Sequence, residues 1–280
     1  MVEISQVNVF PVKSLRGIAL QSTTLGVRGL AFDRHWMITD ISGRFVTQRE
    51  LQTMATIAVR LSAQALVLEH ESAVPLVLSL APADGRQVEV TVWNDRCVAT
   101  DEGEAASRWL TNVLGMWRGG PLRLVRFAAS HRRPVDAHDL RGEQSHTAFA
   151  DGFPFLVTSE SSLAALNSRL AAQGIQPVTM DRFRPNIVLR GLAPFEEDRL
   201  VSLQYTDGRY ALELRKPCSR CAITSIDQVT GEVVVSREPL RTLMAMKTQP
   251  ELPGAYFGQN ASLLAGEGES ITVGDTLIAR

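Results

Sequence analysis

The sequence predicts a mainly β protein with some α-helix, in the α+β class. Val88, Val90 and Val92 alternate with other residue types, and a period of two is typical of a half-buried strand. Asp207 and Gly208 separate two strand-like runs, which is a strong signal for a β-hairpin. Apolar residues at helical spacing are confined to a few short segments, so we expect strands to dominate the fold.

The composition indicates an ordinary globular protein with no excess of positive charge. The chain has 280 residues, a length that fits one large or two medium-sized domains. A net charge of −1 argues against binding to nucleic acids or anionic membranes. The sequence shows neither an apolar run of membrane-spanning length nor a signal peptide. Three cysteines are too few for a disulfide framework and favour a cytoplasmic, reducing location.

In the N-terminal half, the sequence predicts a hairpin, a helix and a connection. Residues 37–47 contain two strand-like runs around a short polar loop and predict the hairpin. Asp101 and Glu104 resemble a capping box, and the apolar residues that follow recur at helical spacing until Gly115. Residues 118–146 have little pattern, so we expect them to form a loop that connects two β-rich domains.

In the C-terminal half, the sequence predicts two further helices and two hairpins. Ser159 is expected to cap a helix that Gly174 ends. Residues 200–215 form the hairpin around Asp-Gly, and residues 222–236 predict another around a Thr-Gly pair. Pro239 is a good first-turn residue and is expected to begin a short helix.

The most informative segment is Lys-Pro-Cys-Ser-Arg-Cys at residues 216–221. A structural zinc site normally needs four ligands, whereas only Cys97 remains outside the pair. A redox pair normally opens a helix, whereas a strand is expected to follow Cys221. Two buried structural cysteines are a further alternative. Because Arg220 precedes Cys221 and a cation beside sulfur favours the thiolate, the segment also indicates a possible nucleophile or soft-metal ligand.

Several cations lie in loops at predicted strand ends, which is a pattern suited to an anionic ligand. Arg182 and Arg184 precede an apolar strand, and their alternation predicts that they point to the same side. Lys13 and Ser14 follow an N-terminal strand, and Arg34 precedes another. Taken singly, each reads as a solvated surface charge; taken together, they fit an anionic cofactor. No dinucleotide fingerprint, Walker A loop or nucleophile elbow is present.

Five segments in the same order resemble the MOSC-domain proteins, and in particular the branch of the mitochondrial amidoxime-reducing component and its bacterial counterparts. The resemblance covers nearly the whole chain and ends at the closing strand near residues 273–275. It rests on Phe-Pro-Val-Lys-Ser at 10–14, Asp-Arg-His-Trp at 33–36, Phe-Arg-Pro-Asn at 183–186, Lys-Pro-Cys-Ser-Arg-Cys at 216–221 and Phe-Gly-Gln-Asn at 257–260.

This resemblance implies an N-terminal MOSC-associated β-barrel domain at residues 1–117 and a MOSC β-barrel domain at 118–280. It implies a molybdenum cofactor, Mo-molybdopterin, between the two domains, with Cys221 as metal ligand and catalytic residue. The family's domain description also includes pyridoxal phosphate binding. The remaining residues that the resemblance assigns to the cofactor are Lys13, Ser14, Arg34 and Arg184 at the pterin and its phosphate, Ser219 and Arg220 along the same pocket, and Asn186 and Asn260.

The resemblance implies an enzyme that reduces N-hydroxylated compounds such as amidoximes, hydroxylamines and N-hydroxylated bases. Some relatives carry a ferredoxin-type domain, but this chain has no four-cysteine cluster, so electrons are expected from a separate ferredoxin- or cytochrome-type donor protein with its reductase. A carrier of molybdenum cofactor or sulfur without turnover of its own is the second hypothesis. A thiol protein with a reversible Cys218–Cys221 bridge is the third.

Overall fold

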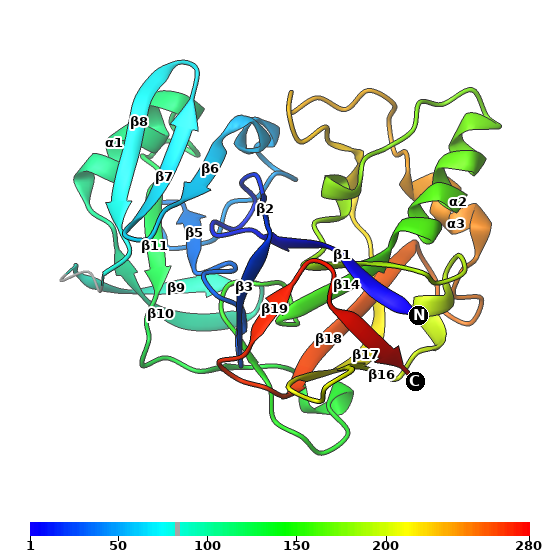
Figure 1. Ribbon diagram of the computed structural model, residues 1–280. Helices are drawn as coiled ribbons and strands as arrows, with labels where there is room; N and C mark the ends of the chain where they lie inside the picture. Colours follow the sequence, from blue (N-terminus) through cyan, green and yellow to red (C-terminus); the bar gives the residue numbers. More distant parts are fainter. Residues whose placement is uncertain (82–84) are drawn as a thin grey trace.

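The computed structural model describes residues 1–81 and 85–280 and confirms a mainly β fold. Figure 1 shows two halves side by side, with both chain termini on the C-terminal half. Each helix in the described part of the chain is too short or too polar to cross a bilayer. The α-helices found there are α1 (Glu104–Leu114), α2 (Glu160–Ala171) and α3 (Leu240–Met246).

A closed barrel forms the C-terminal half. Eight strands lie in the order β15-β14-β18-β17-β16-β20-β1-β2, and a further pairing of β15 with β1 closes seven of them into a ring. The barrel core is built from buried aliphatic and aromatic side chains of these strands. The strand bounds are β1 (Val2–Val9), β2 (Ile18–Leu20), β14 (Phe155–Ser159), β15 (Ile187–Arg190), β16 (Ser202–Tyr205), β17 (Ala211–Ser219), β18 (Tyr256–Ala265) and β20 (Thr276–Ala279).

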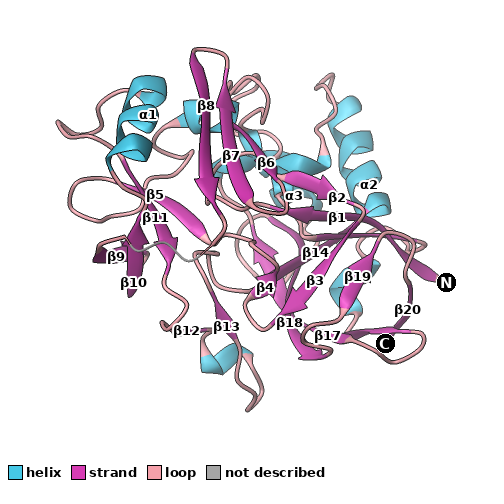
Figure 2. Ribbon diagram, turned by 60° about the vertical axis from the view of Figure 1, so that its left-hand side comes forward, coloured by secondary structure: helices cyan, strands magenta, loops and turns pink. Residues whose placement is uncertain are grey.

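Smaller sheets make up the rest of the molecule. Figure 2 shows α1 beside the sheet β6-β7-β8, and buried side chains of both belong to one apolar cluster. A four-stranded sheet has the order β5-β11-β10-β9, and the remaining strands form the sheets β19-β3-β4 and β12-β13. Their bounds are β3 (Ser22–Gly26), β4 (Gly29–Leu30), β5 (Trp36–Thr39), β6 (Ala58–Leu61), β7 (Ala65–His70), β8 (Ala73–Ser79), β9 (Gln87–Val92), β10 (Asp95–Asp101), β11 (Arg123–Phe127), β12 (Arg133–Pro134), β13 (His146–Thr147) and β19 (Ser270–Thr272).

The two halves exchange strands. β1, at the start of the chain, pairs with β15 and β20 of the barrel. In the opposite sense, β11 pairs with β5 and β10 in the four-stranded sheet of the N-terminal half. The prediction that residues 118–146 form a loop is therefore wrong at residues 123–127, which form β11. Its two arginines face acidic partners (Arg123 with Asp101, Arg126 with Glu102, each at 2.6 Å), and these charges hid the strand pattern.

The predicted helices are present, and one predicted cap is wrong. Ser159 caps α2 by accepting a hydrogen bond from the Ser162 amide at 3.2 Å, as expected. The capping box at α1 does not form, because Gly103 occupies the N-cap position and Asp101 pairs with Arg123. Figure 1 shows α2 and α3 side by side on the C-terminal half, where both pack on the side chains around Phe257.

Three predicted hairpins can be compared with the structure. The hairpins at residues 37–47 and 200–215 are confirmed, the second as β16 paired with β17. The hairpin at 222–236 is wrong: Ala222–Ser225 form a 3-10 turn, and residues 232–236 are not in a strand. Thr224 donates its hydroxyl to the Cys221 carbonyl at 2.9 Å, and this local bond favours the turn over the extended form that β-branched residues suggest.

We predict that Gly258→Ala destabilises the barrel strongly. Gly258 lies in β18 with φ of 78°, and an added Cβ would lie 2.6 Å from the Val157 carbonyl oxygen. The left-handed backbone and the overlap together are expected to lower the free energy of unfolding by about 3 kcal/mol. Gly174→Ala is the control, because φ there is 73° with nothing within 4 Å of the new Cβ, so about 1 kcal/mol is expected. Urea unfolding measures both; equal losses would contradict the overlap at Gly258.

Candidate functional site

A cavity of about 530 Å³ lies where the loops of the N-terminal half meet the barrel. Its wall includes the loop after β1, the loop before β15 and the segment that leaves β17. The structure thus brings together all nine residues that the family resemblance assigns to the metal and the cofactor; what each does toward a cofactor stays a prediction. They are Lys13, Ser14, Arg34, Arg184, Asn186, Ser219, Arg220, Cys221 and Asn260.

The thiol of Cys221 lies next to a cation that the sequence analysis missed. Cys221 is half-buried, directly before the 3-10 turn, and its Sγ accepts a hydrogen bond from Arg49 Nε at 3.3 Å. The expected neighbour, Arg220, instead donates to Cys218 Sγ at 2.9 Å and to the Phe183 carbonyl at 2.7 Å. Each cysteine of the pair is a free thiol and has its own arginine.

Two guanidinium groups lie close to the same aromatic ring. Arg34 and Arg184 each lie 4.3 Å from the centroid of the Phe10 ring. Arg34 binds both carboxylate oxygens of Asp33, at 2.7 and 2.5 Å. Arg184 bonds to the Leu15 carbonyl at 2.7 Å, and burial together with the charge of Arg34 lowers its pKa to about 9. This pair of cations is short of negative charge, so it is suited to an anion.

Arg182 does not join Arg184, which contradicts the predicted alternation. Residues 180–183 form a 3-10 turn and Arg184 has φ of 56°, so the two side chains are not related by strand geometry. Arg182 instead pairs with Asp227 at 3.1 Å, away from the cavity wall.

An ion pair forms another part of the wall. Lys13 Nζ donates to the Phe149 carbonyl at 2.8 Å and to Asp151 Oδ1 at 2.5 Å. Burial lowers the pKa of Lys13, although the Asp151 charge opposes the shift. For Asp151, partial desolvation in the cavity wall acts to raise the pKa, but the positive charges of Lys13 and Arg49 outweigh this effect and lower the pKa overall. Asp151 is therefore ionised, and its side chain is 60% exposed toward the cavity.

The four uncharged polar residues differ in how far their side chains are already engaged. Asn186 accepts from the Leu156 amide at 3.1 Å and donates to the Asn8 carbonyl at 3.2 Å, so its amide braces β14 against β1. Asn260 donates weakly to the Pro217 carbonyl at 3.4 Å. Ser219 is exposed at the end of β17, whereas Ser14 is buried with φ of 67°.

The sequence analysis missed two charged residues that line the cavity, Arg49 and Asp151. Arg49 follows the strand-like run at 45–47, so it carried the same signal as Lys13, a cation after a strand. Asp151 carried no such signal, because its partners are 138 and 102 residues away in the chain. Further lining residues are Thr47, Ala150, Gly152, Phe153, Phe155, Leu156, Phe183, Lys216, Pro217, Cys218, Ile223, Leu252 and Tyr256.

The site offers a metal the sulfurs of Cys218 and Cys221 rather than a full set of ligands. Across residues 1–81 and 85–280, His, Cys, Asp and Glu side chains nowhere gather in a group of three that could hold a metal ion. Cys97 is buried in the N-terminal half among residues such as Met37 and Val90. A structural zinc site, one of the alternatives for the cysteine pair, is therefore excluded among the described residues. A metal bound through Cys221 would have to arrive with its other ligands already attached.

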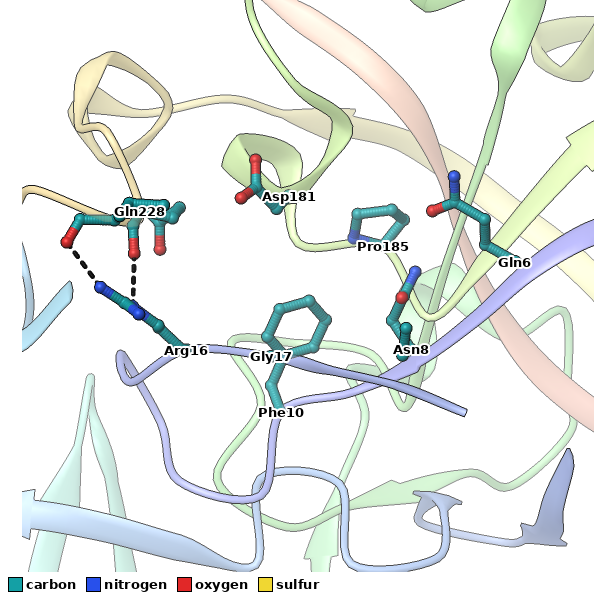
Figure 3. Close-up of a pocket in the computed structure, with 10 residues that line it drawn as sticks. Gln6, Asn8, Phe10, Arg16, Gly17, Asp181, Pro185 and Gln228 are labelled. Atoms are coloured by element: carbon teal, nitrogen blue, oxygen red, sulfur yellow. Dashed lines mark hydrogen bonds between the residues drawn. The ribbon is translucent and has the colours of Figure 1, made fainter. Parts of the chain in front are cut away.

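A second cavity, of about 210 Å³, lies near Phe10, as Figure 3 shows. Arg16 is fixed at its edge by bonds to the backbone carbonyls of Gln228 at 2.8 Å and Val229 at 2.5 Å. None of the nine predicted residues lines this cavity. Arg16 thus joins the loop after β1 to the loop at 228–229, and its donors are occupied by the protein's own carbonyls.

Comparisons with protein-family models match two domains along the chain. Residues 1–117 match the MOSC N-terminal beta barrel domain. Residues 144–278 match the MOSC domain. The two matches together account for most of the chain, and the cavity draws its lining residues from both.

Curated relatives carry two different names. Mitochondrial amidoxime-reducing component 1 of Homo sapiens is 34% identical over 254 residues, covering 87% of this chain and 72% of the relative. The protein of that name from Xenopus laevis is 32% identical, covering 87% and 71%. Molybdenum cofactor sulfurase of Oryza sativa subsp. japonica is 30% identical over 96% of this chain but only 34% of the relative.

We predict that His35 makes the protein sensitive to acid. His35 lies beside the cavity loop, between Phe32 and Trp36, and burial lowers its pKa to about 4 from 6.5. Between these values the unfolded chain binds a proton that the folded protein excludes. Stability is therefore lost as the pH falls from 6.5 to 4, by about 3 kcal/mol. His35→Phe should flatten this part of the stability curve in urea unfolding at several pH values; an unchanged curve would rule out His35 as the cause.

We predict that the cofactor-free chain binds inorganic phosphate between Arg34 and Arg184. Phosphate at about 100 times its Kd should stabilise the folded protein by about 2.7 kcal/mol, seen as a higher Tm. Arg184→Gln should abolish this stabilisation. Arg44→Gln should not, because Arg44 pairs with Glu50 outside the cavity. Equal phosphate shifts in the Arg184 variant and the parent protein would place the anion elsewhere.

Proposed function

We propose that this chain, which belongs to the MOSC-domain family, is a molybdenum-cofactor-dependent oxidoreductase that reduces small N-hydroxylated compounds. The observation that carries the proposal is the half-buried Cys221 thiol at a cation-lined cavity between the two halves. The names of the amidoxime-reducing relatives support this substrate class.

The residues present fit a cofactor with an anionic end and its own sulfur chelator. Arg34 and Arg184 would hold the phosphate, because, of these two half-buried cations, only Arg34 binds a carboxylate, that of Asp33. Arg220 lies along the same wall, with its Nε buried and without a hydrogen-bond partner among the described residues. Cys221 would supply one soft ligand to a thiophilic metal. The bound cofactor supplies two-electron chemistry that no side chain of the chain provides.

The side chains of the protein would hold the sulfur ligand in place and form the wall of the cavity around it. Arg49 fixes the Cys221 sulfur through an N–H donor, and the Lys13–Asp151 pair keeps a charged wall beside it. The overall reaction is R–NHOH plus two electrons and two protons to R–NH2 plus water. The N–O bond breaks, the nitrogen is reduced and the oxygen leaves as water.

The electrons would come from a separate donor protein of the ferredoxin or cytochrome type. The sequence has three cysteines, fewer than a four-cysteine iron–sulfur cluster requires. All three are free thiols, which suits the cytoplasmic, reducing location that forms part of the proposal.

A carrier of molybdenum cofactor or sulfur is the second candidate. The specific observation in its favour is the second thiol of the cavity, Cys218, with Arg220 Nη1 at 2.9 Å from its sulfur. The molybdenum cofactor sulfurase relative, matched over 96% of this chain, supports the same alternative. A carrier would hold the cofactor without reducing an N-hydroxylated compound.

We predict that protein from a host that makes molybdopterin contains molybdenum and pterin and reduces an amidoxime with a chemical electron donor. Cys221→Ala should lower turnover at least about 100-fold, since loss of even an outer-shell partner of a metal costs up to that factor. Cys97→Ala is the control, because Cys97 is buried and does not line the cavity.

Metal analysis, pterin release and turnover are measured on the same samples. Bound cofactor without turnover of any N-hydroxylated compound would favour the carrier. Full activity of Cys221→Ala would contradict the proposed metal ligand.

A further inference from the structure

Trp93 lies at the tip of the β9–β10 hairpin in an unusual backbone conformation. Val92 pairs with Asp95, so the turn consists of Trp93 and Asn94 alone. Trp93 has φ of 55°, a left-handed value that glycine or asparagine adopts readily and a bulky residue adopts rarely. Its side chain is also 42% exposed, which is unusual for so large an apolar group. A strained residue of this kind points to a role beyond the turn itself.

The indole of Trp93 contacts two charged groups of the cavity wall, one of which, Arg49, also contacts the Cys221 sulfur. Arg49 lies over the ring, with its guanidinium carbon 4.6 Å from the ring centroid. The indole N–H donates to Asp151 Oδ1 at 3.1 Å. Phe45 packs against the ring from below the turn, at 5.0 Å between centroids. One side chain therefore holds a cation and a carboxylate of the cavity wall in fixed relation.

Arg49 depends on these contacts for its position. Its Nε reaches Cys221 Sγ, and Nη2 lies 3.8 Å from Asp151 Oδ2. Within residues 1–81 and 85–280, no other hydrogen bond of the Arg49 side chain is found, and 26% of that side chain is exposed. Arg34 by comparison binds a buried carboxylate and a backbone carbonyl. A long side chain with one sulfur contact needs the aromatic face to limit its rotamers.

We propose that Trp93 is a positioning residue, which holds the Arg49 guanidinium against the Cys221 sulfur through its ring and holds Asp151 through its N–H. The hairpin of the N-terminal half thereby completes the surroundings of a sulfur that belongs to the C-terminal half. The importance of that sulfur for catalysis rests on the proposed function, whereas the positioning itself is a property of the cofactor-free chain.

The test compares two alkylating reagents on the cofactor-free full chain, made in a host without molybdopterin. Iodoacetate is an anion and iodoacetamide is neutral, and both react with the thiolate. The ratio of their rates at Cys221 therefore reports the local positive potential independently of thiol ionisation. Mass spectrometry of the peptide that contains each cysteine gives the rates site by site.

We expect Trp93→Gly to lower the ratio at Cys221 roughly fivefold, the Boltzmann factor for one unit charge about 4 Å away in water. Arg49→Gln should lower it equally. Glycine suits the left-handed turn, so this variant is expected to fold. Trp93→Phe keeps a ring under Arg49 but loses the N–H donor, so an intermediate ratio is expected. Arg44→Gln is the matched control, because Arg44 also lies over an aromatic ring but pairs with Glu50.

Cys218 is an internal control, since its arginine, Arg220, has no contact with Trp93. An unchanged ratio at Cys221 in Trp93→Gly, with a lowered ratio in Arg49→Gln, would overturn the role of Trp93. An unchanged ratio in both would overturn the placement of Arg49. A protein without molybdenum or reductase activity would refute the proposed function and leave these ratios as they are, so the two failures are distinguishable.

Discussion

The pairing of β1 with β15 is the constraint on which the candidate site depends. The two strands are antiparallel, with Val7 opposite Ile187, so the end of one lies beside the beginning of the other. The loop that follows β1 carries Phe10, Lys13 and Ser14, and the turn that precedes β15 carries Arg184. The backbone hydrogen bonds between β1 and β15 close the barrel, and the same bonds bring the cationic residues of the cavity wall together.

Around the cavity, cationic side chains outnumber the carboxylates that pair with them. Asp33 forms an ion pair with Arg34, and Asp151 forms ion pairs with both Lys13 and Arg49. Arg184 and Arg220 each donate to a backbone carbonyl and pair with no carboxylate among the described residues. Carbonyl oxygens satisfy the N–H donors of an arginine without neutralising its positive charge. The low dielectric constant of the cavity wall strengthens the electrostatic potential of this remaining charge. An anion is therefore the natural complement of this surface.

Local signals accounted for much of the fold and for the identity of most site residues. Ser159, the Asp-Gly turn and the valine alternation each act over a few residues, and the structure contains the helix, hairpin and strand they predicted. β11 escaped notice because Arg123 and Arg126 find their acidic partners on other elements. Tertiary structure decides which arginine contacts Cys221. Adjacency in sequence favoured Arg220, whereas the fold places Arg49, 172 residues away in the chain, beside the sulfur.

The placement of β1 also bears on how the chain acquires its shape during synthesis. This strand emerges from the ribosome well before its partners β15 and β20, which lie far along the chain. At about 5–20 residues per second, the first strand waits on the order of tens of seconds for its neighbours. Throughout that interval its apolar side chains and open backbone edge have no barrel to enter. The N-terminal half must therefore fold during synthesis while β1 is still unpaired with β15 and β20. In this interval a chaperone could bind the exposed hydrophobic strand.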